Sequence, residues 1–246
     1  MTDVLSLRNS TNSLFTYKVM FDGGTAPNPF HKTCTLAICK PVIRRTAEVG
    51  DIVVGLAPGN DGRIVYVMVV DKKIPWAAYI QECSNPSSAL HKKIPKSPTD
   101  QGDCIWKSAP TYVGVLPSHS GHGEDDFNHD VTNGVNVLLS VNFWYFGEGD
   151  THELYLNDAL KPMIPGRGHK SKINEKYKEY FVEFFNNFLT EEKIIHCGIH
   201  GTPKHAPSNE GKITCIPSCR QQQRDNESEG EEDDTTPTIT CPNKKC

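Results

Sequence analysis

Two runs of β-branched residues, separated by a short turn sequence, constrain the fold more than any other feature of this chain. The runs are Asp51–Leu56 and Arg63–Val70, and the segment between them, Pro58–Gly62, contains two glycines, an asparagine and an aspartate. Val and Ile favour the pleated surface of a sheet, whereas Gly, Asn and Asp supply the backbone angles of a tight turn. The pattern therefore predicts an antiparallel hairpin.

Other segments in the first two thirds of the chain also have the character of short strands. Apolar and polar residues alternate at Phe15–Met20, which is typical of a half-buried strand, and Cys34–Cys39 forms a compact apolar run. Later strands are expected at Tyr112–Val115 and Val135–Phe143. These strands lie close together in the sequence, so most of their pairings are expected to be antiparallel.

Helices are predicted at two places. Pro41 suits the first turn of a short helix that runs to Ala47. A longer amphipathic helix is predicted over Ile173–Leu189, where five aromatic residues fall on one face: Tyr177, Phe181, Phe184, Phe185 and Phe188. Two segments rich in Ser with Pro, Gly, Lys or His predict long loops at Ser84–Asp103 and Pro117–Asp130.

Many short strands with one or two helices predict an α+β fold. The segment Val49–Val54, followed by Arg63–Val70, resembles the Gly-Asp hairpin of PUA-like barrels, the group that includes ASCH, EVE and YTH domains. This resemblance implies a mainly antiparallel, PUA/ASCH-like β-barrel with flanking helices and a long C-terminal amphipathic helix. Many such domains bind RNA or modified bases.

Charge is concentrated in the last part of the chain. From Gln221 to Cys246 there are seven acidic and three basic residues, which gives a net charge of −4, the formal charge of the whole protein. A segment without aromatic residues and with a dense block of like charge is expected to be disordered. We therefore divide the chain into an N-terminal extension (1–14), a folded domain (15–211) and a disordered acidic tail (212–246), which is a possible site for a protein partner.

The sequence also argues against several classes of protein. No apolar run approaches the ~20 residues of a membrane span, and the N-terminus lacks the apolar core of a secretory signal. Nine cysteines without such a signal favour a reducing compartment, so the expected location is cytoplasmic or nuclear. P-loop and nucleophile-elbow motifs are absent. The cysteine spacings miss the usual CxxC pairs, so no metal is predicted, and no cofactor can be named.

The densest group of candidate binding residues lies between the first two predicted strands. Two glycines and two prolines fix the loop Phe21–Phe30. Asn28, between the prolines, presents an amide that can read the edge of a base, and Phe30 can stack on a base. Arg44 and Arg45 can hold phosphate. The alternative is a tight structural turn with solvated arginines.

Candidates for catalysis are more scattered. Asp22, Cys34, Asp103, His119 and His169 are the groups that an enzyme would use. Cys34 can act as a nucleophile if a neighbour lowers its pKa, although its apolar surroundings also suit an inert buried thiol. His119 lies in a polar loop suited to acid–base catalysis, but a plain surface histidine fits equally well. Arg167 and His169 precede the long helix and are a second choice for phosphate.

The order of several motifs resembles the second class of the nucleotide-modification-associated domain family. APNPF is followed by CTLAICKPVIRR and GDIVVG, and the later pieces also fit in order: Gly102-Asp103 with Trp106, His119-Ser120, Val137–Phe143, Tyr145–Gly147 and Arg167–His169. The resemblance covers Tyr17 to Phe188. Cys104 departs from the polar amide expected after the Gly-Asp pair.

This resemblance implies a nucleotide or base-modification context, with nucleic acid or a nucleotide as the partner. The leading hypothesis is recognition of a nucleobase, with Asn28 and Phe30 on the base and Lys40, Arg44, Arg45 and Arg167 on phosphate. The first alternative is an enzyme that transfers or removes a group on a base or nucleotide, using His119, Asp103 and an arginine. The second is a protein-interaction scaffold that works through the acidic tail.

Overall fold

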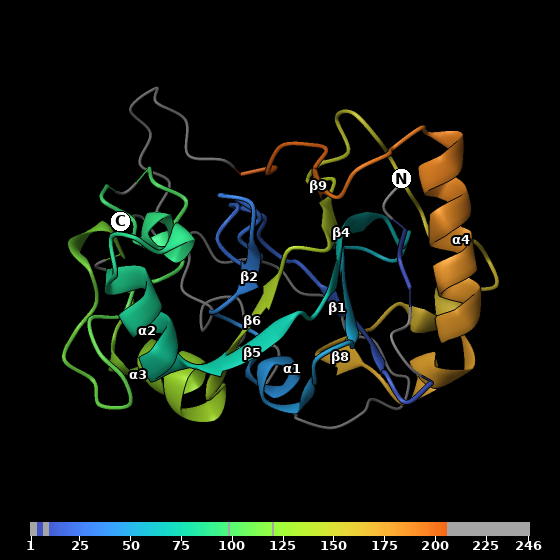
Figure 1. Ribbon diagram of the computed structural model, residues 1–246. Helices are drawn as coiled ribbons and strands as arrows, with labels where there is room; N and C mark the ends of the chain where they lie inside the picture. The colour runs from blue at the N-terminus through green and yellow to red at the C-terminus, as the bar shows by residue number, and fades with distance from the viewer. Residues whose placement is uncertain (1–3, 7–9, 98, 120, 206–246) are drawn as a thin grey trace, which may run out of the picture.

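The computed structural model describes residues 4–6, 10–97, 99–119 and 121–205. The predicted acidic tail, 212–246, lies outside the described residues. The described elements form four layers, which Figure 1 shows from the long helix on one side to the short helices on the other. The layers are a helix, a six-stranded sheet, a three-stranded sheet and a group of short helices, with an apolar cluster between each pair.

The larger sheet is mixed, with the strand order β8-β1-β3-β4-β7-β9. Its strands are β1 (Leu14–Lys18), β3 (Ile52–Leu56), β4 (Ile64–Val69), β7 (Phe143–Tyr145), β8 (His169–Lys170) and β9 (Gly198–Ile199). The predicted hairpin is confirmed as the antiparallel pair β3 and β4. The parallel pairs are β1 with β3 and β7 with β9.

The smaller sheet is antiparallel, with the order β2-β6-β5. Its strands are β2 (Cys34–Leu36), β5 (Lys72–Pro75) and β6 (Asn136–Ser140). The helices are α1 (Pro41–Thr46), α2 (Trp76–Ser84), α3 (Glu124–Phe127) and α4 (Lys178–Glu191), with a π-helical turn at Asn128–Asn133. The short helix after Pro41 is therefore confirmed.

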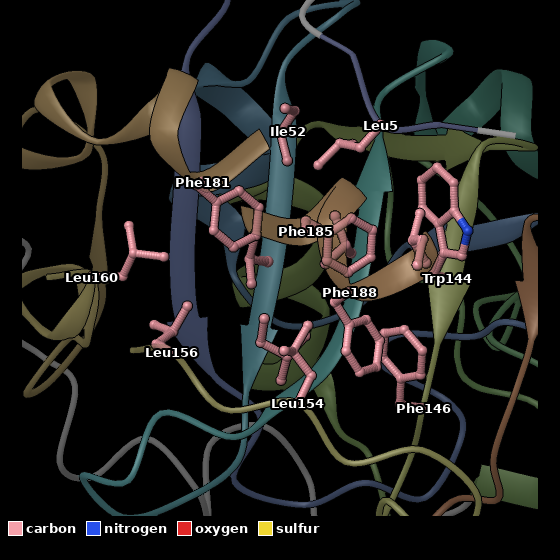
Figure 2. Close-up of a cluster of buried hydrophobic side chains, with 14 of the residues drawn as sticks. Leu5, Ile52, Trp144, Phe146, Leu154, Leu156, Leu160, Phe181, Phe185 and Phe188 are labelled. Carbon is pink, nitrogen blue, oxygen red and sulfur yellow. The ribbon is translucent and has the colours of Figure 1, made fainter. Parts of the chain in front are cut away.

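Helix α4 packs on the outer face of the larger sheet, as its aromatic stripe predicts. Phe185 lies edge-on to Trp144 with 5.4 Å between ring centroids, and Phe188 lies edge-on to Phe146 at 5.7 Å. Figure 2 shows Phe185 and Phe188 facing Trp144 and Phe146, in the same cluster as Ile52 of the sheet. A single-turn 3₁₀ segment, Ile173–Lys176, precedes α4, so the α-helix itself begins later than predicted.

The inner face of the larger sheet carries tyrosines. The register between β3 and β4 shifts after Gly55, so that Val65 and Tyr66 both belong to the cluster between the sheets. A Cβ at Gly55 would collide with the Tyr66 ring, so this glycine makes room for the ring. The Tyr17 and Tyr66 hydroxyls lie 2.9 Å apart within this cluster.

The sequence prediction is wrong in the region that covers the smaller sheet. The predicted loop Ser84–Asp103 contains a 3₁₀ helix at Ala89–Lys93, and the predicted loop Pro117–Asp130 contains α3 and the start of the π-helical turn. The predicted strand Tyr112–Val115 is reduced to one bridge between Trp106 and Val115. These segments are too short to be stable alone and depend on packing around buried aromatic residues.

The expected α+β class and the mainly antiparallel pairing are confirmed. The described strands form two open sheets and no closed barrel. At the edges of the larger sheet lie the two-residue strands β8 and β9, which pair with β1 and β7 among the described strands.

Candidate functional site

The loop from Phe21 to Lys32, called the Asp22 loop below, is held by contacts on several sides. Asn28 exchanges two backbone hydrogen bonds of 2.9 Å with Thr35 of β2. The side-chain amide of Asn28 donates to the carbonyl of Gln101, and the Gln101 amide donates to the carbonyl of Gly23 over 3.4 Å. The amide of Asn28 is therefore engaged within the protein.

Lys93 anchors the same loop with a fully buried ammonium group. Its Nζ donates to the carbonyl of Asn28 (3.0 Å), to the side-chain oxygen of Asn28 (2.6 Å) and to the carbonyl of Thr33 (2.6 Å). These bonds use all three donors of the ammonium. Burial lowers the pKa of Lys93, an effect that nearby Asp103 opposes. Lys93 thus fixes the loop, and its buried ammonium group places a positive charge next to the loop backbone.

Asp22 is bound far less completely than Lys93. The residue is only 5% exposed, and the Tyr145 hydroxyl donates to its Oδ1 over 2.6 Å. Its Oδ2 is buried and makes no hydrogen bond to any described residue. Burial raises the pKa of Asp22, whereas the hydroxyl of Tyr145, the backbone N–H groups of Lys204 and Gly24 and the charge of His205 lower it. A buried acceptor without a partner costs about 1–3 kcal/mol, so it marks a place where a ligand or ordered water is needed.

The segment Gly201–His205 is held near this loop by a close crossing with the end of β7. A Cβ at Gly147 would collide with the carbonyl of Thr202, and a Cβ at Gly201 would collide with the carbonyl of Phe146. Both positions therefore need glycine. The crossing directs the end of the segment onto the Asp22 loop.

His205 is the residue of this segment that contacts the loop. Its backbone N–H donates to the carbonyl of Asp22 over 2.8 Å. Its ring stacks on the ring of Phe21, with 4.5 Å between centroids and 13° between planes. The ring of Phe30 lies against Gly24, whose φ of +73° favours glycine. The loop thus carries one aromatic ring next to Asp22 in sequence and a second one against Gly24.

Two lysines, Lys32 and Lys92, lie beside His31 at one end of the loop, and we call these lysines the cationic rim. All three are exposed. Burial lowers the pKa of the His31 imidazole, and the positive charges of Lys93 and Lys92 lower it further. This dependence shows that the rim has a positive potential, which suits an anionic ligand.

Cys34 lies in β2 and is fully buried. Burial raises the pKa of its thiol to about 12, although Lys93 opposes the rise. A thiol with this pKa is protonated at neutral pH, so its environment is that of an inert core cysteine and not of an activated nucleophile.

Asp103 is also fully buried, and both of its carboxylate oxygens are bound. Thr35 donates to Oδ2, and the Tyr79 hydroxyl donates to Oδ1 over 2.5 Å. Burial raises the pKa of Asp103, and Lys93 opposes this effect. The carboxylate therefore links β2 to α2 behind the Asp22 loop.

Arg44 joins α1 to the smaller sheet. Its side chain is fully buried, and its guanidinium forms an ion pair of 3.7 Å with Asp130. It also donates to three backbone carbonyls, those of Cys39 (2.6 Å), Asp130 (2.7 Å) and Asn136 (2.8 Å). These contacts hold the Arg44 guanidinium inside the protein, away from the surface where phosphate could bind.

Lys40 and Arg45 lie at the two ends of the same helix. The Lys40 ammonium stands 5.0 Å from the centre of the Tyr17 ring, and burial lowers its pKa to about 8. Arg45 is exposed, and its Nη1 donates to the carbonyl of Asn133 over 2.7 Å. Of the basic residues on α1, Arg45 is the one whose side chain faces solvent.

The remaining predicted residues lie elsewhere in the fold. His169 is in β8, paired with Tyr17, and its ring is 6.0 Å from that of Phe15. Arg167 is exposed just before β8. His119 ends a 3₁₀ turn at Pro117–His119. The structure thus brings Asn28, Cys34 and Asp103 together around Lys93, with Phe30 in the same loop as Asn28. It places the other candidates in or next to α1, β8 and this turn.

Sequence reasoning missed several residues that complete the site: Phe21, Lys93, Gln101, Tyr145 and His205. Lys93 lies in a Lys-Lys pair, which is ordinarily a sign of a solvated surface. Tyr145 occurs in a strand motif whose alternation does show that its side chain faces the same way as Phe143. No sequence signal connects His205 with Asp22.

Within the described part of the chain, no cluster of three or more His, Cys, Asp or Glu side chains is arranged to hold a metal ion. None of the helices described is long and apolar enough to cross a membrane. The cysteines at 215, 219, 241 and 246 lie outside the described residues.

The chain was also compared with known proteins. Neither the comparison with curated proteins nor the comparison with solved structures finds a match. The family model described as nucleotide modification associated domain 2 matches residues 11–210. This match includes every strand and helix of the described fold and the whole Asp22 loop. The chain therefore belongs to the nucleotide modification associated domain 2 family.

Proposed function

We propose that this domain binds a nucleobase, in a nucleic acid or a nucleotide, at the Asp22 loop. The observation that carries the proposal is the buried Oδ2 of Asp22, which has no hydrogen-bond partner among the described residues. A carboxylate oxygen of this kind can accept a hydrogen bond. Nucleobase edges present amino and imino donors that such an oxygen can bind.

The surroundings of Asp22 support the same ligand class. Phe30 is placed beside the loop glycines, where its ring can contact the flat face of a base. The cationic rim lies at the end of the loop and suits phosphate. Membership of a family associated with nucleotide modification provides the biological context.

The proposal changes the roles of some residues expected from the sequence. Asn28 becomes a positioning residue, because its amide is already bonded to Lys93 and Gln101. For phosphate we retain the exposed Arg45 and Arg167 alongside the rim, and we leave out the buried Arg44. Catalysis through Asp103 has less support, because both of its oxygens are bound within the core.

Binding measurements with Asp22→Asn test the proposal. The probes are fluorescein-labelled single- and double-stranded oligonucleotides with plain or 5-modified pyrimidines, together with free nucleotides, at two salt concentrations. Asparagine keeps the shape but can place an NH2 donor where the carboxylate oxygen Oδ2 accepts, so we expect the preference among bases to fall by about tenfold. Asp158→Asn is the control, since Asp158 is exposed and pairs with Lys161 at 2.6 Å.

Lys92→Ala provides the complementary measurement on the cationic rim. It is expected to weaken binding to all sequences alike and to reduce the dependence of affinity on salt concentration. Equal base preference in wild type and Asp22→Asn would refute the assignment of Asp22. Absence of binding to every probe by folded wild-type protein would refute the proposed function itself.

A further inference from the structure

The stacked pair of Phe21 and His205 differs from the aromatic pairs of the core because it reaches solvent. His205 is exposed and Phe21 is partly exposed, whereas the phenylalanines of α4 that pair with other rings belong to the apolar cluster under that helix. The two rings are nearly parallel, with 13° between planes and 4.5 Å between centroids. A nucleobase stacked on a phenylalanine adopts the same arrangement.

The position of the pair connects it with Asp22. Phe21 immediately precedes Asp22, and the backbone N–H of His205 donates to the Asp22 carbonyl over 2.8 Å. The imidazole charge of His205 also acts on the Asp22 carboxylate, whose pKa it lowers. His205 therefore covers one face of the Phe21 ring and is bonded to the residue that carries the unpartnered acceptor.

Among the described residues, His205 is attached by its backbone N–H to Asp22 and by its ring to Phe21. Upstream, Pro203 touches Gly24, and the crossing at Gly147 and Gly201 fixes the start of the segment. The ring of His205 itself has one ring partner, Phe21, among the described residues. The imidazole can therefore leave Phe21 while the crossing stays in place.

We propose that Phe21 is the stacking surface for the bound base, and that His205 covers this surface in the ligand-free protein and is displaced when the base binds. The inference rests on the proposed function and adds to it the residue that stacks and the residue that competes. It assigns Phe21 a role that the sequence suggested for Phe30 alone.

The two residues are predicted to have opposite effects on affinity. His205→Ala removes the competitor, so we expect binding of a fluorescein-labelled single-stranded DNA 12-mer to become about two- to tenfold tighter. Phe21→Leu removes the stacking surface, so we expect binding to become at least about fivefold weaker, and Phe21→Trp should restore it. His196→Ala, at an exposed histidine away from the loop, should leave the affinity unchanged.

A second measurement follows the histidine directly. The Phe21 ring current shifts the His205 ring protons upfield in the free protein, and this NMR signal should move towards its unstacked position when the 12-mer is added. Replacement of the adenines by 2-aminopurine should give fluorescence quenching that Phe21→Leu abolishes.

The outcomes separate this inference from the proposed function. Weaker binding by His205→Ala would show that His205 is itself a ligand contact and would overturn its role as a competitor. Unchanged affinity in both Phe21→Leu and His205→Ala, with base preference still lost in Asp22→Asn, would overturn the inference and leave the proposed function standing. If no variant changed the preference among bases, both the inference and the proposed function would be refuted.

Discussion

Three buried charged residues near the site meet their hydrogen-bonding needs to different degrees. Lys93 places its three donors on three oxygens, and Arg44 places its guanidinium on three carbonyls and one carboxylate. Asp22 has one bond from Tyr145 and an unused oxygen. Because unsatisfied buried groups destabilise a fold, the two complete cases suit structural roles and the incomplete case suits binding.

Lys40 allows a prediction about pH. Its pKa is lowered by burial from 10.5 to about 8, so the unfolded chain binds more protons than the native protein between these pH values. The stability of the wild type is therefore expected to increase as the pH rises from 8 to 10.5. Lys40→Met should raise the free energy of unfolding by about 1–2 kcal/mol at pH 7, after allowance for the part of the side chain that reaches solvent.

Chemical denaturation of both proteins at pH 7, 8.5 and 9.5 checks this prediction. The difference between them should shrink as the pH rises, because the wild-type lysine loses its charge. A constant difference over this range would show that burial does not destabilise the Lys40 ammonium.

At the level of single residues, the sequence singles out several groups but not their arrangement. Asn28 was chosen for base reading and Cys34 and Asp103 for catalysis, and the structure places all three around Lys93. Arg44, however, looks like any surface arginine of a short helix. Its burial depends on Gly134, where a Cβ would collide with the guanidinium, and this contact spans ninety positions of sequence.

Among the secondary-structure elements, α4 carries the largest single apolar seam, so it is the place to test how the layers are held together. Phe185 is fully buried and contacts Trp144, Phe146 and Phe181 through its ring. Phe185→Ala is expected to lower the free energy of unfolding by about 3–5 kcal/mol, through lost burial and the cavity left behind. Urea denaturation gives the value.

Glu183→Ala serves as the matched control, since this residue lies on the exposed face of the same helix. Its effect should stay within about 0.5 kcal/mol. A loss below 1 kcal/mol in Phe185→Ala would mean that α4 is not packed on the sheet as described.

The elements that could be predicted from the sequence are those with a long regular pattern or a distinctive turn. The hairpin β3–β4 has both, and α4 repeats its aromatic residues over three turns. Helix α2 was missed although Trp76, Tyr79 and Cys83 bury one of its faces, because nine residues hold too few repeats to stand out. The turn after α3 is π-helical, which no simple period predicts.

For the whole molecule, the distribution of charge matters most. The chain outside Gln221–Cys246 is formally neutral, so any affinity for nucleic acid must come from local features such as the cationic rim. The family match ends at residue 210, before the acidic run that begins at Asp225. His205, at the Asp22 loop, precedes Asp225 by only twenty positions. Twenty extended residues span at most about 70 Å, so the acidic run can reach the site.

Removal of residues 221–246 is therefore expected to tighten oligonucleotide binding at low salt. Seven acidic residues compete with phosphate for the same cations, and salt screens this competition over about 10 Å at 0.1 M. A few-fold gain in affinity at 50 mM salt should disappear at 500 mM. A full-length variant with the seven acids replaced by amides distinguishes charge from bulk: an electrostatic tail predicts the same gain in both proteins. A gain in the truncated protein alone would instead show that the tail obstructs the site sterically. No gain in either protein would show that the tail does not affect binding.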